Sequence, residues 1–263
     1  MTDQLVRIAV ISVYFLIVLA IGLAAYRRTG TGTEEYFLGG RSAKTLVLFM
    51  ALFGTNVTPF VLMGIPGLAY HGGIGVFGLN AAIIVLGIPL TIYLIGFPAW
   101  RAARRLGAVT PAELYAKRFD SPTLGILLFV VFFVWTVLYM VTSVSGVGVA
   151  VEILSDGEIG FEFAAAAILV LTLAYTSAGG MRATMWTNVF QGSVFLAFTV
   201  LAFFWISADH GGLEALSNQI RQDSPRLLTT PSPDKPGPFA PGAWMSWGLG
   251  ISLTVIAFPH MMV

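Results

Sequence analysis

The amino-acid sequence predicts an all-α integral membrane protein with about seven transmembrane helices. Hydrophobic residues make up 57% of the 263-residue chain and charged residues only 10%, whereas a soluble domain carries about 25% charged residues. The apolar runs are long enough to cross a bilayer, and basic residues gather in every second connection between them. A soluble fold of this size could not bury so much apolar surface, so lipid must surround much of it.

Each predicted span is an apolar run close to the roughly 20 residues that a helix needs to cross a hydrocarbon core of about 30 Å. The runs are apolar on every face, which favours helices over the alternating strands of a β-barrel. The fifth run is short and ends at the sequence SAGG (177–180), which predicts a tight turn into the sixth. The predicted spans are Ile8–Tyr26, Thr45–Tyr70, Gly75–Trp100, Leu124–Glu152, Phe163–Ser177, Met185–Ser207 and Ala243–Val263.

The composition argues against several functional classes. There is no cysteine, so disulfides, thiolate metal sites and cysteine nucleophiles are excluded. A net charge of +1 is not the basic excess that nucleic-acid binding would require. The histidines do not cluster and no nucleophile–base pair can be recognised, so we expect neither an enzyme nor a transition-metal site. The first apolar run is long enough to span and is followed by no cleavage site, so we expect no cleaved signal peptide.

The distribution of charge predicts the orientation in the membrane. Basic residues follow the first, third and fifth spans, whereas the alternate connections hold Lys or Arg only in one long loop, and acidic residues collect on that second side. By the positive-inside rule, the N-terminus lies outside the cell membrane. The predicted cytoplasmic set is Arg27, Arg28, Arg41, Lys44, Arg101, Arg104, Arg105, Lys117, Arg118 and Arg182.

Two connections have a predicted structure of their own. Thr110, Pro111 and Glu113 form a capping box, which predicts a short cytoplasmic helix through Arg118. The external segment 211–242 begins with a predicted helix, Leu213–Arg221, and continues through a proline-rich, polyproline-like stretch at 230–236. Its composition is that of a solvated loop.

The second span contains two prolines, which predict a broken helix at mid-membrane depth. Pro59 lacks an N–H and removes the helical partner of the Thr55 carbonyl, and Pro66 does the same for Leu62. An unpaired carbonyl in hydrocarbon costs several kcal/mol, so protein, water or a ligand must satisfy it. Freed carbonyls beside the side-chain oxygens of Asn56 and Thr58 would suit Na⁺. The pattern fits equally well a proline kink that is packed against a neighbouring helix.

Asp, Glu, Lys and Arg are absent from the middle of every predicted span. A proton-coupled mechanism usually requires such a residue, so their absence favours sodium as the coupling ion. Na⁺ is the only metal that we expect, and no cofactor is implied.

Four sequence motifs resemble those of the sodium:solute symporter family. They are YFLGGRS at 36–42, LMGIPG at 62–67, TPAELYAKRF at 110–119 and YTSAGGMRA at 175–183, the last followed by WTNVFQ at 186–191. The YTSAGGMRA motif is the most specific, and the motifs are spread along most of the chain, from residue 36 to residue 191.

The resemblance implies the leucine-transporter fold, which consists of two inverted five-helix repeats after an extra N-terminal helix. Residues 8–26 would be the extra helix, 45–207 the first repeat, 208–242 an external loop and 243–263 the first helix of an incomplete second repeat, in one transmembrane domain over 1–263. The backbone carbonyls of Gly54 and Val57 would then bind sodium. Arg41 would lie at the cytoplasmic gate, and the positions that would line the substrate or ion path are Thr55, Asn56, Thr58 and Asn80.

Three departures from the family pattern affect these expectations. Asn188 stands where members commonly carry an aspartate of the inner sodium path, and an amide cannot supply that charge. Val61 and Asn80 stand where sugar carriers have glutamine and glutamate, which argues against a sugar. The family is also nearly twice as long as this chain, so we expect the chain to be an N-terminal fragment that does not transport by itself.

The expected function of the intact protein is therefore Na⁺-coupled symport of a small organic solute, carboxylate or amino-acid-like, across the cell membrane. Its partners would be the lipid bilayer and the solute, with no nucleic acid. Two alternatives remain open: a transporter-like membrane sensor, or a half-transporter that needs a complementary chain for the second repeat.

Overall fold

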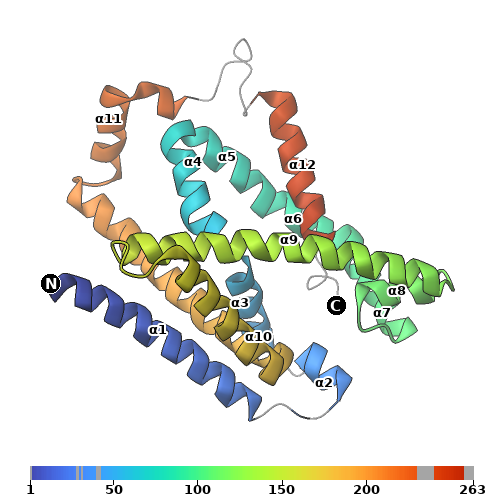
Figure 1. Ribbon diagram of the computed structural model, residues 1–263. Coiled ribbons are helices and arrows are strands. Elements are labelled where there is room, and N and C mark those ends of the chain that lie inside the picture. Colours follow the sequence, from blue (N-terminus) through green and yellow to red (C-terminus); the bar gives the residue numbers. More distant parts are fainter. Residues whose placement is uncertain (1, 28–29, 31, 40–42, 230–239, 258–263) are drawn as a thin grey trace. The chain divides into compact units, whose positions relative to one another are not determined.

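The computed structural model describes all residues except 1, 28–29, 31, 40–42, 230–239 and 258–263 (Figure 1). The described residues are helical, with connecting turns and no strand. They form two compact units, residues 1–62 with 137–201 and residues 63–136 with 202–263, and each is considered by itself. The elements are α1 (Thr2–Tyr26), α2 (Thr33–Leu38), α3 (Thr45–Asn56), η2 (Phe60–Gly64), α4 (Ile65–Gly72), α5 (Ile74–Ala82), η3 (Ile83–Gly87), α6 (Ile88–Thr91), η4 (Ile92–Gly96), α7 (Phe97–Leu106), α8 (Pro111–Arg118), α9 (Pro122–Leu154), α10 (Phe161–Asp209), α11 (Leu213–Asp223), η5 (Pro225–Leu228) and α12 (Pro241–Ala257).

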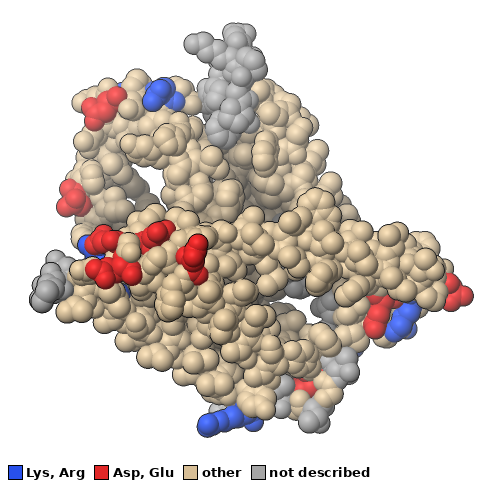
Figure 2. Space-filling model, viewed as in Figure 1, with Lys and Arg blue, Asp and Glu red and all other residues tan. Residues whose placement is uncertain are grey.

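The apolar helices confirm an integral membrane protein with several spans. Within the described part of the chain, four helical segments are long and apolar enough to cross a membrane: Gln4–Tyr26, Ile74–Leu106, α9 and α10. A bent pair, Thr45–Asn56 with Phe60–Gly72, would be a fifth. The surface in Figure 2 is correspondingly dominated by uncharged residues, and many large apolar side chains are exposed. The count of seven stays a prediction, because α10 contains two predicted spans and α12 has only 17 described residues.

In the first unit, α1 packs along α10. Val18 and Ala25 of α1 are buried with Tyr175 and Ala183 of α10 in one apolar cluster. Gly22 allows this approach, because a Cβ at that position would overlap the side chain of Tyr175. Small residues at a helix crossing let two backbones come close, which is how helices associate in lipid.

Helix α10 is two helices that meet at Gly180. The backbone there has φ 54° and ψ −147°, a conformation that is almost restricted to glycine. The predicted tight turn at 177–180 is therefore confirmed in position. A Cβ at Gly180 would also overlap the Tyr36 carbonyl oxygen. The short helix α2 therefore packs directly against the bend.

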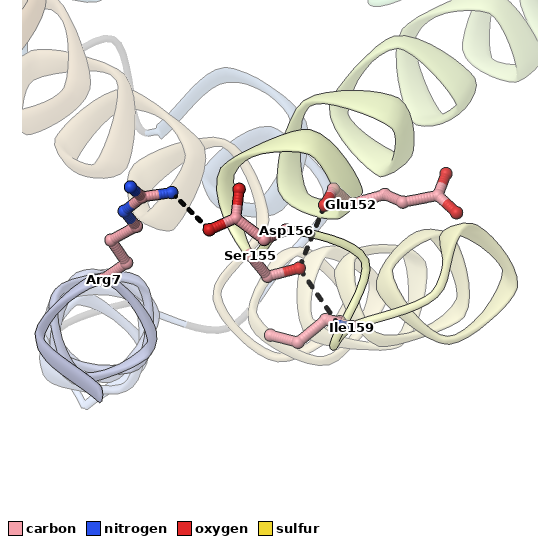
Figure 3. A network of polar contacts seen from close by, with 5 residues as sticks. All are labelled: Arg7, Glu152, Ser155, Asp156 and Ile159. Atoms are coloured by element: carbon pink, nitrogen blue, oxygen red, sulfur yellow. Dashed lines mark hydrogen bonds and ion pairs between the residues drawn. The ribbon is translucent and has the colours of Figure 1, made fainter. Parts of the chain in front are cut away.

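The turn between α9 and α10 is anchored to α1 by an ion pair (Figure 3). Arg7 donates to the Asp156 carboxylate over 2.7 Å, and both side chains are at least half exposed. Beside it, the fully buried Ser155 hydroxyl accepts from the Ile159 N–H (3.0 Å) and donates to the Glu152 carbonyl (3.1 Å). This network closes the turn that follows α9, although the exposed ion pair itself contributes little to stability.

In the second unit, residues 74–106 form one long helix with two π-helical turns, η3 and η4, and η2 is a third such turn. A proline follows each turn at its second position: Pro66 after η2, Pro89 after η3 and Pro98 after η4. A proline deprives the carbonyl four residues earlier of its donor and crowds it. In each case that carbonyl belongs to the central residue of the π turn. The helix therefore accommodates each proline by widening into a π turn just before it.

Helix α12 lies against α5, η3 and α6 in the same unit. The contact is closest at Gly87, where a Cβ would overlap the side chain of the buried Ser252. The loop that precedes α12 also returns to this unit, because a Cβ at Gly73 would overlap the backbone of Leu227 in η5. Residues 230–236, predicted to be polyproline-like, lie outside the described residues.

Two predicted connections are confirmed. The Thr110 hydroxyl accepts from the Glu113 N–H over 3.2 Å, and α8 ends at Arg118. The Glu113 carboxylate returns to the N–H of Val109 (2.8 Å) instead of that of Thr110, so the capping box is displaced by one residue. The helix predicted at Leu213–Arg221 is α11, which extends to Asp223.

The predicted orientation can be tested directly because the chain has no cysteine. We expect a membrane-impermeant maleimide to label Gln222→Cys in α11 on intact cells and to label Arg118→Cys in α8 only after permeabilisation. Both side chains are exposed, so accessibility to the reagent is decided by the membrane. The reverse pattern would place the N-terminus inside.

Candidate functional site

The break predicted in the second span is present in the first unit. Helix α3 ends at Asn56, residues Val57 and Thr58 are not helical, and the chain becomes helical again at Pro59. The helices on either side are bent by 63°. Val57 N–H turns back to the Gly54 carbonyl (3.1 Å), and Thr58 N–H reaches only the Asn56 carbonyl (3.0 Å).

This geometry leaves main-chain oxygens without donors. Among the described residues, no hydrogen-bond donor reaches the carbonyls of Thr55 and Val57. The Thr55 carbonyl is the one whose helical partner would have been the missing N–H of Pro59. The Gly54 carbonyl accepts one hydrogen bond and keeps a second lone pair. Three main-chain acceptors within four residues, with few donors to satisfy them, make the break suited to a cation that prefers oxygen ligands.

The side chains at the break differ in how many of their hydrogen-bonding groups are already used. The Thr55 hydroxyl donates to the Ala51 carbonyl (2.9 Å) and accepts from the Asn188 amide (2.7 Å). Asn56 is exposed, and its amide donates to the Leu52 carbonyl (2.8 Å), which leaves its side-chain oxygen available. Thr58 is half-buried, and its hydroxyl forms no hydrogen bond within the described part of the chain.

Two helices enclose the break through glycine contacts. At Gly54 the α3 backbone meets the backbone of Asn188, and a Cβ there would overlap it. Gly192, one turn further along α10, lies against Gly54. On another side, a Cβ at Gly146 of α9 would come within 2.6 Å of the Pro59 ring. The break is thus held where three backbones approach closely.

Asn188 therefore contacts the site in two ways. Its backbone lies against Gly54, and its side-chain amide donates to the Thr55 hydroxyl. It lies on the half of α10 that follows Gly180. Sequence reasoning identified Asn188 only through the resemblance and did not place Gly146 or Gly192 at the break. The spacing of Asn188 and Gly192, which places both on one helix face, was the available signal.

The structure does not test the two remaining predicted residues. Asn80 lies in α5 of the second unit, where its amide donates to the Val76 carbonyl of the same helix (2.9 Å). Arg41 lies outside the described residues. The predictions that Asn80 lines the path and that Arg41 forms a gate stay untested.

A second polar contact joins α2 to the bend in α10. Arg182 pairs with Glu35 over 2.6 Å, and both side chains are only about a quarter exposed or less. The Tyr36 hydroxyl donates to the carbonyl of Ser177 (3.3 Å), and Gly39 packs against Met185. The helix half that carries Asn188 is therefore fixed at its start by α2.

Comparison with known proteins decides the family. The family model described as the sodium:solute symporter family matches residues 36–263. The chain belongs to the sodium:solute symporter family. Its relatives are transporters and not enzymes, in agreement with the expectation from the sequence.

Two relatives illustrate the similarity. The sodium/pantothenate symporter of Escherichia coli (strain K12) is 30% identical over 262 residues, which is 99% of this chain and 53% of the relative. Sodium/glucose cotransporter 1 of Oryctolagus cuniculus is 31% identical over 227 residues, 84% of this chain and 33% of the relative. The chain thus spans about half the length of the first and a third of the second. No solved structure matches.

We predict that Gly54→Ala destabilises the chain, because its Cβ would overlap the Asn188 backbone, which cannot move aside as a side-chain tip could. Overpacking of this kind costs about 1–3 kcal/mol, and thermal unfolding in detergent should show a lowered Tm. Gly67→Ala in α4 is the control, because a Cβ there meets nothing within 4 Å. Equal melting of the two variants would contradict the close crossing.

Proposed function

We propose that the protein containing this chain transports a small organic solute together with Na⁺, and that Na⁺ binds at the break between α3 and η2. The observation that carries the proposal is the pair of carbonyls, Thr55 and Val57, that lack donors beside the partly used Gly54 carbonyl. Membership of the family supports sodium coupling in general. In this proposal α3 and the helix after it would move about the break during alternating access.

The proposed ion ligands are the carbonyls of Gly54 and Val57, with the Thr55 carbonyl as a further candidate. A bare cation in a low-dielectric site must replace its water with several oxygens. The three carbonyls lie within four consecutive residues, and the Asn56 side-chain oxygen is next to them in sequence. The Thr55 hydroxyl is a weaker candidate, because its proton and one lone pair are already used by Ala51 and Asn188.

A carboxylate or amino-acid-like solute is the proposed substrate class. The relative that aligns along nearly the whole chain is named a sodium/pantothenate symporter. The glucose cotransporters are similar over a smaller share of their length, and Val61 and Asn80 depart from the residues of sugar carriers. Asn56 and Thr58 would present polar groups to the solute, and the N-terminus would lie outside.

Transport should be measured in proteoliposomes that contain the complete gene product. We expect an inward Na⁺ gradient to drive uptake of a labelled carboxylate or amino acid from a panel that also contains pantothenate and glucose. An equal K⁺ gradient should drive none. Uptake that follows a proton gradient and ignores Na⁺ would refute sodium coupling, and uptake of glucose alone would refute the substrate class.

We further predict that Asn188→Asp raises the affinity for sodium. The amide contacts the Thr55 hydroxyl at 2.7 Å, so a carboxylate in its place would put a negative charge next to the break. An increase of roughly tenfold, equivalent to about 1.4 kcal/mol, is expected in ²²Na⁺ binding by the purified 263-residue chain. The control is Asn218→Asp, which makes the same change on the exposed surface of α11. A similar change of sodium affinity in both variants, or no change in either, would show that Asn188 does not belong to the ion path.

A further inference from the structure

We propose that the end of α7 and the last turn of α8 form a binding site for the headgroup of an anionic phospholipid. Between residues 97 and 118 the chain carries five basic residues and the single acidic residue Glu113. The basic residues are Arg101, Arg104, Arg105, Lys117 and Arg118. All of them belong to the second unit.

The charge begins where an apolar span ends. Residues 74–100 contain no Asp, Glu, Lys or Arg, and three arginines then follow within five residues. Helix α7 continues the span without interruption, so its last turns leave the hydrocarbon and enter the headgroup layer. Clusters of basic residues in this position attract anionic lipid, with about 1 kcal/mol for each basic residue near the surface.

Two of the arginines are fixed by aromatic rings. The Arg101 guanidinium lies 4.3 Å from the centre of the Phe97 ring, and that of Arg104 lies 5.3 Å from the Trp100 ring. The two rings are themselves stacked, with centroids 5.7 Å apart. A ring covers only the flat face of a guanidinium, so the in-plane N–H donors stay free to bind a phosphate through two hydrogen bonds.

Most of this positive charge has no carboxylate partner among the described residues. Among the described residues, Arg101, Arg104, Arg105 and Arg118 form no ion pair, whereas Arg7 and Arg182 each have a carboxylate partner. Glu113 is directed to the Val109 N–H and lies 4.0 Å from Lys117. An anion from outside the chain would therefore be the partner of this group.

The turn between the helices brings the two basic ends together. Gly107 ends α7 in the left-handed conformation (φ 60°, ψ 34°), and the Lys117 ammonium donates to the Gly107 carbonyl over 2.8 Å. Ala108, Pro111 and Leu114 are buried beneath the turn. The last turn of α8 is thus attached to the end of α7.

A phospholipid fits this group better than a free phosphate does. Phe97 and Trp100 are 43% and 38% exposed, so an apolar surface borders the basic one. Aromatic rings favour the level of the headgroups, where one side meets acyl chains and the other meets water. A lipid satisfies both surfaces with one molecule, and inorganic phosphate satisfies only the charged one.

The test compares lipid binding by the whole chain and two variants that each lose three charges. Binding of a labelled phosphatidylglycerol would be titrated against phosphatidylcholine in zwitterionic detergent. We expect the dissociation constant of Arg101→Gln/Arg104→Gln/Arg105→Gln to rise roughly tenfold or more. Arg27→Gln/Arg221→Gln/Arg226→Gln, all exposed basic positions outside the group, should change it less than about twofold. Equal losses in both variants would mean general charge attraction and would overturn the site.

A second variant separates a built site from charge alone. Phe97→Leu/Trp100→Leu keeps every arginine and removes the rings that hold two of them, so a several-fold loss is expected, with helix content checked by circular dichroism. Unchanged affinity in this variant would overturn the role of the stacked rings. Millimolar inorganic phosphate should not displace the lipid, and full displacement would identify a phosphate site instead.

Discussion

Every backbone carbonyl in a lipid-facing helix needs a donor, and four prolines in residues 59–98 remove one each. At Pro66, Pro89 and Pro98 the chain widens into a π-helical turn, and the helix continues. At Pro59 it does not: the helix stops, and the carbonyls of Thr55 and Val57 have no donor within the described residues. Proline is thus accommodated within a continuing helix three times and interrupts the helix once. That contrast is the reason to look for a ligand at Pro59 and nowhere else along these helices.

The open position is supported from outside by glycines. Gly54 and Gly192 let α3 and α10 touch, and Gly146 admits the ring of Pro59 beside α9. Because these contacts are made by backbone and by a rigid proline ring, their geometry does not depend on the rotamers of flexible side chains. The oxygens of the break are held by the helices themselves, which suits a site that must recognise a small ion by the positions of its ligands.

The sequence was sufficient where a local rule decides the structure. The proline break, the capping box at Thr110, the α11 helix and the turn at 177–180 each follow from a few adjacent residues. The π turns were not predicted, although each precedes its proline at the same spacing. Pro66 was interpreted only as a helix breaker, and Pro89 and Pro98 carried no prediction.

Contacts between distant segments could not be derived in this way. The amide of Asn188 and the hydroxyl of Thr55 are separated by 133 positions, and no periodicity connects them. Arg182 was predicted only as a cytoplasmic residue and as part of its motif, and its ion pair with Glu35 depends on how α2 meets the bend at Gly180. Family resemblance supplied Asn188 but not its partner.

The packing of α1 has a consequence for biosynthesis. Its partners, Asp156 and Tyr175, lie about 150 residues further along the chain. At a synthesis rate of about 5–20 residues per second, α1 would wait roughly 8–30 seconds in the membrane before they emerge. During that interval Gly22 faces lipid and Arg7 has no carboxylate to bind. Helix α1 can therefore reach its packed position only after the first half of α10 has been synthesised.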